Sequence, residues 1–120
     1  MLKIVINKDK VKVTNGSEIL LVTNNNINAY LKLYSALEGQ EADIYILEHW
    51  GTNIVTLEQF STFPLVSHIY GQSKSDRDAL VQLFSYCGRN DFYVSYKPST
   101  NKFITKVQFV GKKEIQEFII

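Results

Sequence analysis

The first 24 residues alternate between apolar and polar positions, which is typical of antiparallel strands that bury one face. The apolar positions of that face are Leu2, Ile4, Ile6, Val11 and Val13. A two-residue turn at Lys8-Asp9 would pair Ile6 with Val11 and Ile4 with Val13, and so keep all four on one side of a sheet. We therefore predict an N-terminal hairpin.

Asn15-Gly16 marks a second turn, because both residue types accept the positive φ of a tight hairpin. A two-residue loop would set Val13 against Glu18, whereas a three-residue loop sets Val13 against Ile19. We expect a third strand in the second register, with a bulge in the loop. The three strands would form a meander.

Two segments have the three- and four-residue spacing of amphipathic helices. The first, residues 26–38, follows asparagines that can cap it and ends before Gly39. Its predicted apolar stripe comprises Ile27, Tyr30, Leu31, Tyr34 and Leu37. The second, residues 76–87, begins at Ser75-Asp76-Arg77-Asp78, which resembles a capping box. Its predicted stripe comprises Leu80, Val81, Leu83, Phe84 and Cys87.

The middle of the chain is less regular. The run from Ile44 to Leu47 is apolar on both faces, which favours a strand at the centre of the sheet. Residues 54–57 fit a strand, whereas residues 56–59 fit the start of a helix equally well. Pro64 fits the first turn of a short helix that runs toward Gly71.

From residue 92 to residue 110, alternation around a four-residue loop predicts a C-terminal hairpin, and residues 114–120 fit a final short helix or strand. The elements together predict an α+β fold. An antiparallel sheet, built from the N-terminal meander, one or two central strands and the C-terminal hairpin, is covered by two amphipathic helices. No repeat or linker divides the sequence, so we expect residues 1–120 to form a single domain.

Composition agrees with a globular domain, since 45% of the 120 residues are hydrophobic and 21% are charged. Cys87 is the single cysteine and cannot form an intrachain disulfide, which favours a reducing compartment such as the cytoplasm. The sequence contains no signal peptide and no apolar run long enough for a membrane span, so we expect no membrane partner.

Charge is unevenly distributed although the net charge is only +1. Residues 1–17 contain four lysines and one aspartate, and residues 18–73 contain one lysine and six acids. Residues 92–120 contain five lysines and two glutamates. Near-neutrality disfavours a function based on overall charge, but the segregation predicts distinct basic and acidic surfaces.

Motifs for catalysis and cofactor binding are absent from the sequence. The glycines are isolated, without the spacing of a phosphate-binding loop. His49, His68 and Cys87 are far apart, so a zinc site or a Cys-His dyad would require them to converge in space. We expect no cofactor and no metal, and we interpret both histidines as residues of the surface or the core edge.

An enzymatic alternative would use the acidic residues of the central strands. Asp43, Glu48 and Glu58 are carboxylates of the kind that serve metal-dependent hydrolases and nucleases. Glu48 and Glu58 would meet across a hairpin turned at Trp50-Gly51-Thr52. Solvated strand ends explain the same residues more simply, so we favour a protein that is not an enzyme.

The preferred hypothesis is a small binding module that acts through protein contacts, for example an accessory or inhibitory factor of a virus or mobile element. Trp50 is the only tryptophan and is predicted in a turn between His49 and Gly51, with Glu48 nearby. An exposed tryptophan is a natural anchor for a protein partner, so we assign Glu48, His49 and Trp50 to the predicted interface. Alternatively, Trp50 could fold back onto the core.

A second alternative is nucleic-acid binding through the C-terminal hairpin. Its outer face would carry Tyr93, Lys97, Lys102 and Lys106, which combine an aromatic ring for stacking with cations for phosphates. Lysines on an exposed hairpin also protect a sheet edge from strand addition, and this is the simpler interpretation of these residues. Unpaired strands at either terminus could also join two copies of the chain into a homo-oligomer.

Overall fold

The computed structural model describes residues 1–8, 10–59, 65–71, 73–86, 93–97, 102–108 and 115–119. The strands within these ranges are β1 Leu2–Asn7, β2 Lys10–Asn15, β3 Glu18–Thr23, β4 Ile44–His49, β5 Thr52–Glu58, β6 Leu65–Ile69, β7 Tyr93–Lys97, β8 Lys102–Gln108 and β9 Ile115–Ile119. The helices are α1 Asn26–Glu38 and α2 Lys74–Tyr86. The class is therefore α+β, as predicted.

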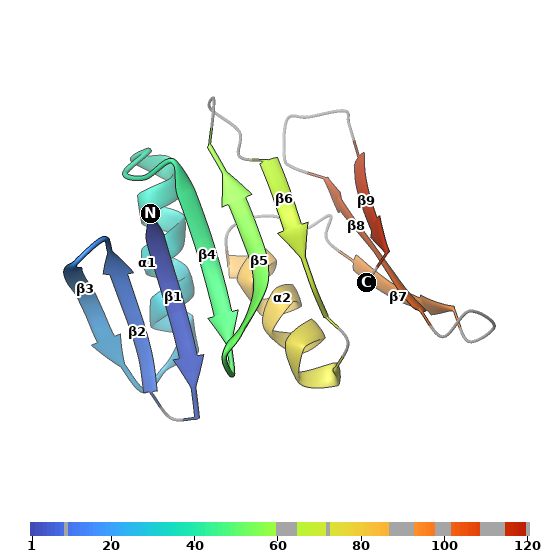
Figure 1. The fold of residues 1–120 in the computed structure, drawn as a ribbon, viewed down its shortest axis with the longest axis horizontal. Coiled ribbons are helices and arrows are strands. Elements are labelled where there is room, and N and C mark those ends of the chain that lie inside the picture. The colour runs from blue at the N-terminus through green and yellow to red at the C-terminus, as the bar shows by residue number, and fades with distance from the viewer. Residues whose placement is uncertain are drawn as a thin grey trace.

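The strands form two sheets (Figure 1). The larger sheet has the order β3-β2-β1-β4-β5-β6, and the smaller has the order β7-β8-β9. The meander β1–β3 and the central position of β4 are as predicted. The C-terminal hairpin does not join the larger sheet, however, so the expectation of one sheet was wrong.

The larger sheet is mixed, which corrects the prediction of an antiparallel sheet. β1 and β4 are parallel, with Ile4 opposite Leu47 and Ile6 opposite His49. Every other neighbouring pair in this sheet is antiparallel. The connection between β3 and β4 passes through α1, and a helical crossover of this kind can return the chain parallel to an earlier strand. Alternation of side chains gives no information on strand direction.

The two N-terminal hairpins differ in how well sequence predicts their register. β1 and β2 pair Ile6 with Val11, as expected. β2 and β3 pair Val13 with Leu21 instead of Ile19, so the predicted second register was wrong. The turn comprises Gly16 and Ser17, and Gly16 has a φ of 61°. The extra residue lies inside β3, where the register shifts next to Val13, instead of in the loop.

α1 has the predicted bounds and ends in a hydrogen-bonded C-terminal motif. The Asn25 side chain caps the start by accepting the Ile27 N–H at 2.9 Å. At the other end, the Gln40 N–H donates to Leu37 O and the Glu41 N–H donates to Ala36 O. This is the Schellman pattern, in which the residue after the cap is left-handed. Here that residue is Gln40, with a φ of 51°, and not Gly39.

The buried face of α1 is rotated from the predicted stripe. Its buried residues are Ala29, Tyr30, Leu33, Ala36 and Leu37. Ile27, Leu31 and Tyr34 are exposed instead. The prediction selected large apolar side chains, whereas the helix approaches the sheet through a face that includes two alanines.

α2 begins two residues before the predicted start. The Ser73 hydroxyl accepts the Asp76 N–H at 3.1 Å, so Ser73 provides the capping oxygen and the predicted capping box at residues 75–78 was misplaced. Leu80, Leu83 and Phe84 are buried as expected. Val81 is exposed, and Cys87 lies outside the described residues.

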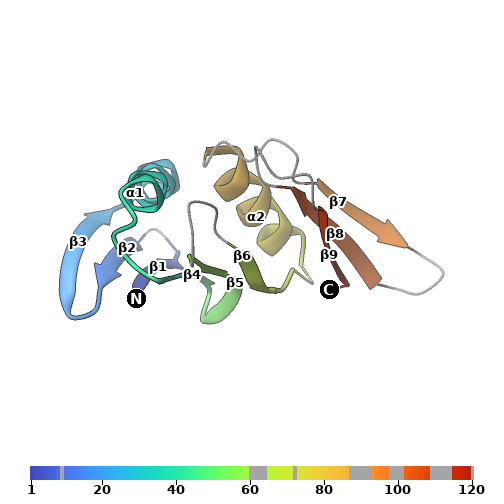
Figure 2. The same cartoon turned by 90° about the horizontal axis from the view of Figure 1, so that it is seen from above.

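Both helices cover the same face of the six-stranded sheet (Figure 2). The core lies between this face and the helices, and its largest side chains are Tyr30 of α1, Tyr45 of β4 and Phe84 of α2. Apolar residues alternate along β1 and β2 with residues that point the other way, such as Lys3 and Lys12. No described element covers that second face, which we call the open face.

The remaining strands resolve the ambiguous part of the sequence. Residues 52–58 form a strand, and residues 65–69 form another. The prediction of a short helix from Pro64 toward Gly71 was therefore wrong. The C-terminal hairpin has the predicted register, with Lys97 opposite Lys102 and Tyr93 opposite Lys106. Residues 115–119 add a third strand to it.

The edges of the larger sheet are β3 and β6. The first strand of the chain is not an edge, because β2 and β4 flank it. Strand addition from a second copy at β1, as the sequence suggested for the N-terminus, is therefore ruled out by this topology. The terminal hairpins also do not lie side by side, since they belong to different sheets.

Candidate functional site

The turn between β4 and β5 presents the only tryptophan of the chain to solvent. His49 pairs with Thr52, so the turn consists of Trp50 and Gly51 alone. Their φ angles are 53° and 81°, and two positive angles define a type I′ turn. The side chain of Trp50 is 55% exposed. The predicted turn is therefore confirmed, and Trp50 does not fold back onto the core.

A tryptophan is an unfavourable residue at this backbone position. Left-handed φ values bring the Cβ atom of an L-residue close to the backbone, at a cost of about 1 kcal/mol or more. Type I′ turns therefore prefer Asn-Gly, and Gly51 fits the second position of that preference. Trp50 occupies the first position, where Asn would be more favourable. Its presence there is not explained by the stability of the turn.

His49 supports the base of the turn from the buried side of the sheet. It is 6% exposed, and its Nδ1 lies 2.6 Å from Asp76 Oδ1 in the first turn of α2. An ionised carboxylate only accepts hydrogen bonds, so Nδ1 donates. The His49 ring also meets the Trp50 ring edge to face, with centroids 6.4 Å apart. His49 thus links the turn to α2, and it is too buried to contact a partner broadly.

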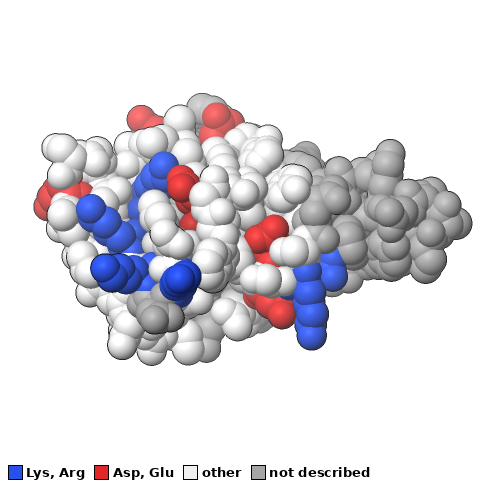
Figure 3. Space-filling view, turned by 60° about the horizontal axis from the view of Figure 1, so that its bottom comes forward, with Lys and Arg blue, Asp and Glu red and all other residues white. Residues whose placement is uncertain are grey.

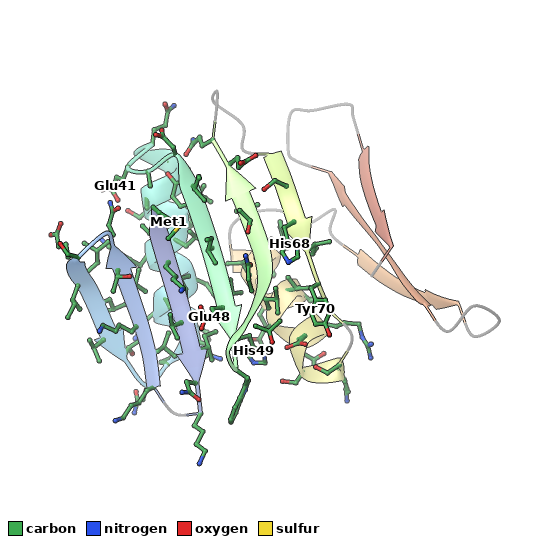
Figure 4. All side chains as sticks on the ribbon, viewed as in Figure 1. Met1, Glu41, Glu48, His49, His68 and Tyr70 are labelled. Atoms are coloured by element: carbon green, nitrogen blue, oxygen red, sulfur yellow. The ribbon has the colours of Figure 1, made fainter. Side chains whose placement is uncertain are left out.

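Glu48 lies on the open face, opposite to the direction of His49. Its carboxylate forms an ion pair with Lys3 at 2.7 Å, and both side chains are partly exposed. Figure 4 shows Glu48 and His49 near the same end of β4. The three predicted interface residues are therefore adjacent in sequence but differ in role: Trp50 is at the tip, His49 is below it and Glu48 is to one side.

The Trp50 turn adjoins the turn between β1 and β2. Because β1 and β4 are parallel neighbours, their C-terminal ends lie side by side at the same end of the sheet. The Trp50 N–H donates to Ile6 O at 2.9 Å, which fixes the turn against the end of β1. Lys8, two residues beyond Ile6, is exposed and has a φ of 51°. Sequence reasoning missed the bond from Trp50 to Ile6 and the bond between His49 and Asp76, because neither is local in sequence.

The predicted carboxylate pair is not formed. Glu48 lies opposite Asn53 near the turn, whereas Glu58 lies opposite Ile44 at the far end of the hairpin. Four residues of strand separate these positions, which corresponds to roughly 13 Å. Asp43 is at the Glu58 end, where its carbonyl accepts the Gln59 N–H. The expectation that Glu48 and Glu58 approach each other was wrong.

His49 and His68 point to opposite faces of the sheet. His68 is on β6 (Figure 4), is exposed and donates from Nε2 to Asn53 O at 3.0 Å. Cys87, the third predicted soft ligand, lies outside the described residues. Among the residues that the structure describes, no group of three or more His, Cys, Asp or Glu side chains could hold a metal ion.

A buried polar cluster lies at the end of β4 and β5 that is farther from the Trp50 turn, and its role is structural. The Tyr45 hydroxyl accepts the Ala42 N–H at 3.1 Å and lies 2.9 Å from Gln59 Oε1, to which it can donate. Gln59 Nε2 donates to Leu37 O at 3.1 Å. Burial raises the pKa of the Tyr45 hydroxyl. The cluster gives Leu37 O a second hydrogen bond beside the one from the Gln40 N–H, and so ties the end of α1 to the residue that follows β5.

The predicted nucleic-acid residues all belong to the C-terminal sheet. The register pairs Tyr93 with Lys106 and Lys97 with Lys102 across β7 and β8. β9, whose position the sequence did not settle, places Glu117 opposite Lys106 in the register. An acidic residue at this position lowers the positive charge that nucleic-acid binding requires.

Neither helix in the described part of the chain is long and apolar enough to cross a membrane. Comparison with known proteins found no matching family model, no matching curated protein and no matching solved structure.

Proposed function

We propose that this chain is a protein-binding module whose contact surface is centred on Trp50. The observation that carries the proposal is the exposed indole at a positive φ of 53°. Trp50 is unfavourable for its own turn and contributes little to the core, so a role in binding explains this residue better than a role in stability does. Large aromatic side chains are the commonest anchors of protein interfaces.

The turn is also held in place before any partner arrives. The Trp50 N–H is bonded to Ile6 O, and the adjacent His49 is bonded to Asp76. Ordering a mobile loop costs free energy on association, so a fixed turn favours affinity. In this proposal Trp50 inserts into the partner, His49 positions Trp50 from below, and Glu48 lies at the rim. We place the module in the cytoplasm, in line with its lone Cys87.

Trp50→Asn is the variant that tests the proposal. Asn suits the first position of a type I′ turn, so this variant is expected to fold and to be at least as stable as the parent chain in urea. Tagged parent and variant chains are used to capture proteins from nuclease-treated lysate of the native cell. We expect at least one protein that the parent retains and that Trp50→Asn loses by about tenfold or more.

Leu31→Gln is the matched control, because Leu31 is an exposed apolar residue of α1, away from the turn. It should retain the same protein as the parent. Equal capture by the parent and Trp50→Asn, or equal loss in the control, would show that Trp50 is not the anchor.

Nucleic-acid binding by the C-terminal hairpin is a second candidate. It is supported by the register that pairs Tyr93 with Lys106 and Lys97 with Lys102, and weakened by Glu117 opposite Lys106. Titration of single-stranded and duplex oligonucleotides at low salt tests it, with Lys97→Glu combined with Lys102→Glu as the variant. Absence of affinity at low salt in the parent chain excludes this function.

A further inference from the structure

A basic surface lies directly beside the Trp50 turn. Lys8, Lys10 and Lys12 are exposed on the hairpin of β1 and β2, at the edge where the Trp50 N–H meets Ile6 O. Figure 3 shows Lys side chains gathered on this side of the molecule. The ion pairs among the described residues are Lys3–Glu48 and His49–Asp76, so these three lysines take part in neither.

Aliphatic side chains lie beside Lys12 on the open face. The strand registers place Val5 and Val22 on either side of Lys12. Val22 is 66% exposed, and Ile19, farther along β3, is 56% exposed. The combination of cations with exposed aliphatic groups defines what we call the basic surface: Lys8, Lys10, Lys12, Val5 and Val22.

We infer that the partner held by Trp50 is a protein that presents an acidic segment with aliphatic side chains to the basic surface. This inference rests on the proposed function and adds the chemistry of the partner to it. Carboxylates complement the unpaired ammonium groups, and the partner's aliphatic groups cover Val5 and Val22. Single-stranded nucleic acid is disfavoured, because successive bases stack on a series of aromatic rings, whereas Trp50 is a single ring and the side chains on either side of Lys12 are aliphatic.

Panning random peptides displayed on phage against the immobilised full-length chain tests the inference without a known partner. Peptides recovered on the parent chain should be enriched in Asp and Glu together with Ile, Leu and Val, compared with the starting library. A recovered peptide without tryptophan is then synthesised. Trp50, the only tryptophan of the chain, reports its binding by fluorescence.

Charge reversal provides the quantitative part of the test. Lys10→Glu combined with Lys12→Glu should lower the affinity of the chain for this peptide by about tenfold. Added salt should lower the affinity of the parent chain for the same peptide. Lys32→Glu is the matched control, because Lys32 belongs to α1 in the helical layer and not to the open face. The control should bind as the parent does.

The outcomes separate the two proposals. Neutral or basic peptides that still require Trp50 would overturn the acidic partner and leave the protein-binding function standing. Peptides that, still displayed on phage, are retained by immobilised Trp50→Asn as well as by the parent chain would count against both proposals, and so would the recovery of no peptide at all. An oligonucleotide that binds more tightly than the peptides through Lys10 and Lys12 would replace the protein partner by a nucleic acid. A peptide that proves to be bound only by a dimer of the chain in light scattering would also overturn the inference.

Discussion

Three residues other than glycine have positive φ angles in the described part of the chain: Lys8, Gln40 and Trp50. Each lies in a tight turn, where a left-handed residue lets the chain reverse. Lys8 and Trp50 lie in turns at the end of the sheet that we propose for binding. Gln40 follows α1 at the opposite end of the sheet, and no binding role is assigned to it. The cost of its conformation should therefore be removable without loss of function.

Gln40→Gly is expected to raise the free energy of unfolding by about 0.5 to 1 kcal/mol, because glycine adopts the left-handed conformation without a steric cost and only part of this gain is offset in the unfolded chain. Urea unfolding measures the change. Gly39→Ala is the matched control: Gly39 has an ordinary φ of −80°, and an added Cβ would meet Ser35 O at 3.5 Å, which is a normal contact. A greater effect at Gly39 than at Gln40 would contradict this account of the helix end.

Tyr45 should make the stability of the protein sensitive to alkaline pH. Burial, chiefly, raises the pKa of its hydroxyl, and the carboxylates of Glu41 and Asp43 add to this, while the hydrogen bond from Ala42 lowers it. The folded state thus favours the neutral phenol. The resulting stabilisation is complete below about pH 10, the ordinary value, and is lost as the pH rises through the raised pKa.

Tyr45→Phe should therefore be less stable at neutral pH, by about 1 to 3 kcal/mol, because it removes the hydroxyl that bonds to the Ala42 N–H and to Gln59 Oε1. It should also lose less stability than the parent chain between neutral and alkaline pH. Urea unfolding across this range measures both effects. Tyr34→Phe, at an exposed tyrosine of α1, is the control and should keep the alkaline loss of the parent. An equal alkaline loss in Tyr45→Phe would refute the assignment.

At the scale of elements, the contact between His49 and Asp76 joins the β4–β5 hairpin to α2. Both side chains are largely buried, so removal of either one leaves the other without its partner. Asp76→Ala is expected to lower the free energy of unfolding by about 3 kcal/mol. The double variant, with His49→Ala and Asp76→Ala, should lose less free energy of unfolding than the two single variants lose in total, because both single changes remove the same contact.

Asp78→Ala is the control for this pair. Asp78 lies in α2 two residues after Asp76 and is exposed, so its removal changes the same charge in the same helix without touching the contact with His49. Urea unfolding of the variants gives the comparison. If Asp76→Ala were no more destabilising than Asp78→Ala, the contact between the hairpin and the helix would contribute nothing to stability.

Elements whose signals are local in sequence could be predicted. The β1–β2 register follows from alternation around a two-residue turn, and α1 follows from Asn25 before it and the spacing within it. The prediction was wrong where the local signal allowed two solutions. Gly16 suited a turn in either register of β2 and β3, and a proline such as Pro64 is compatible with the start of a strand as well as of a helix.

At the scale of the whole molecule, the site could be predicted only in its outermost residue. A tryptophan next to a glycine between two strands indicated an exposed turn, and Trp50 is there. Its surroundings depend on the parallel pairing of β1 with β4 and on the position of α2. Contacts such as Trp50 with Ile6 join distant parts of the chain, and no periodicity in one segment encodes them.

The division into two sheets predicts how the chain can be shortened. β1 to β6, α1 and α2 all lie within residues 1–86, and in the part of the chain that the structure describes β7, β8 and β9 pair only with one another. A chain that ends at residue 91 should therefore still unfold in one cooperative urea transition, with the same change in Trp50 fluorescence and a smaller denaturant slope, because less surface is exposed. A chain that lacks residues 1–15 should not fold, because it loses β1 and β2, the two strands that join β3 to β4. If the chain ending at residue 91 showed no cooperative transition, residues 92–120 would be required for the core, and residues 1–120 would form the single cooperative domain expected from the sequence.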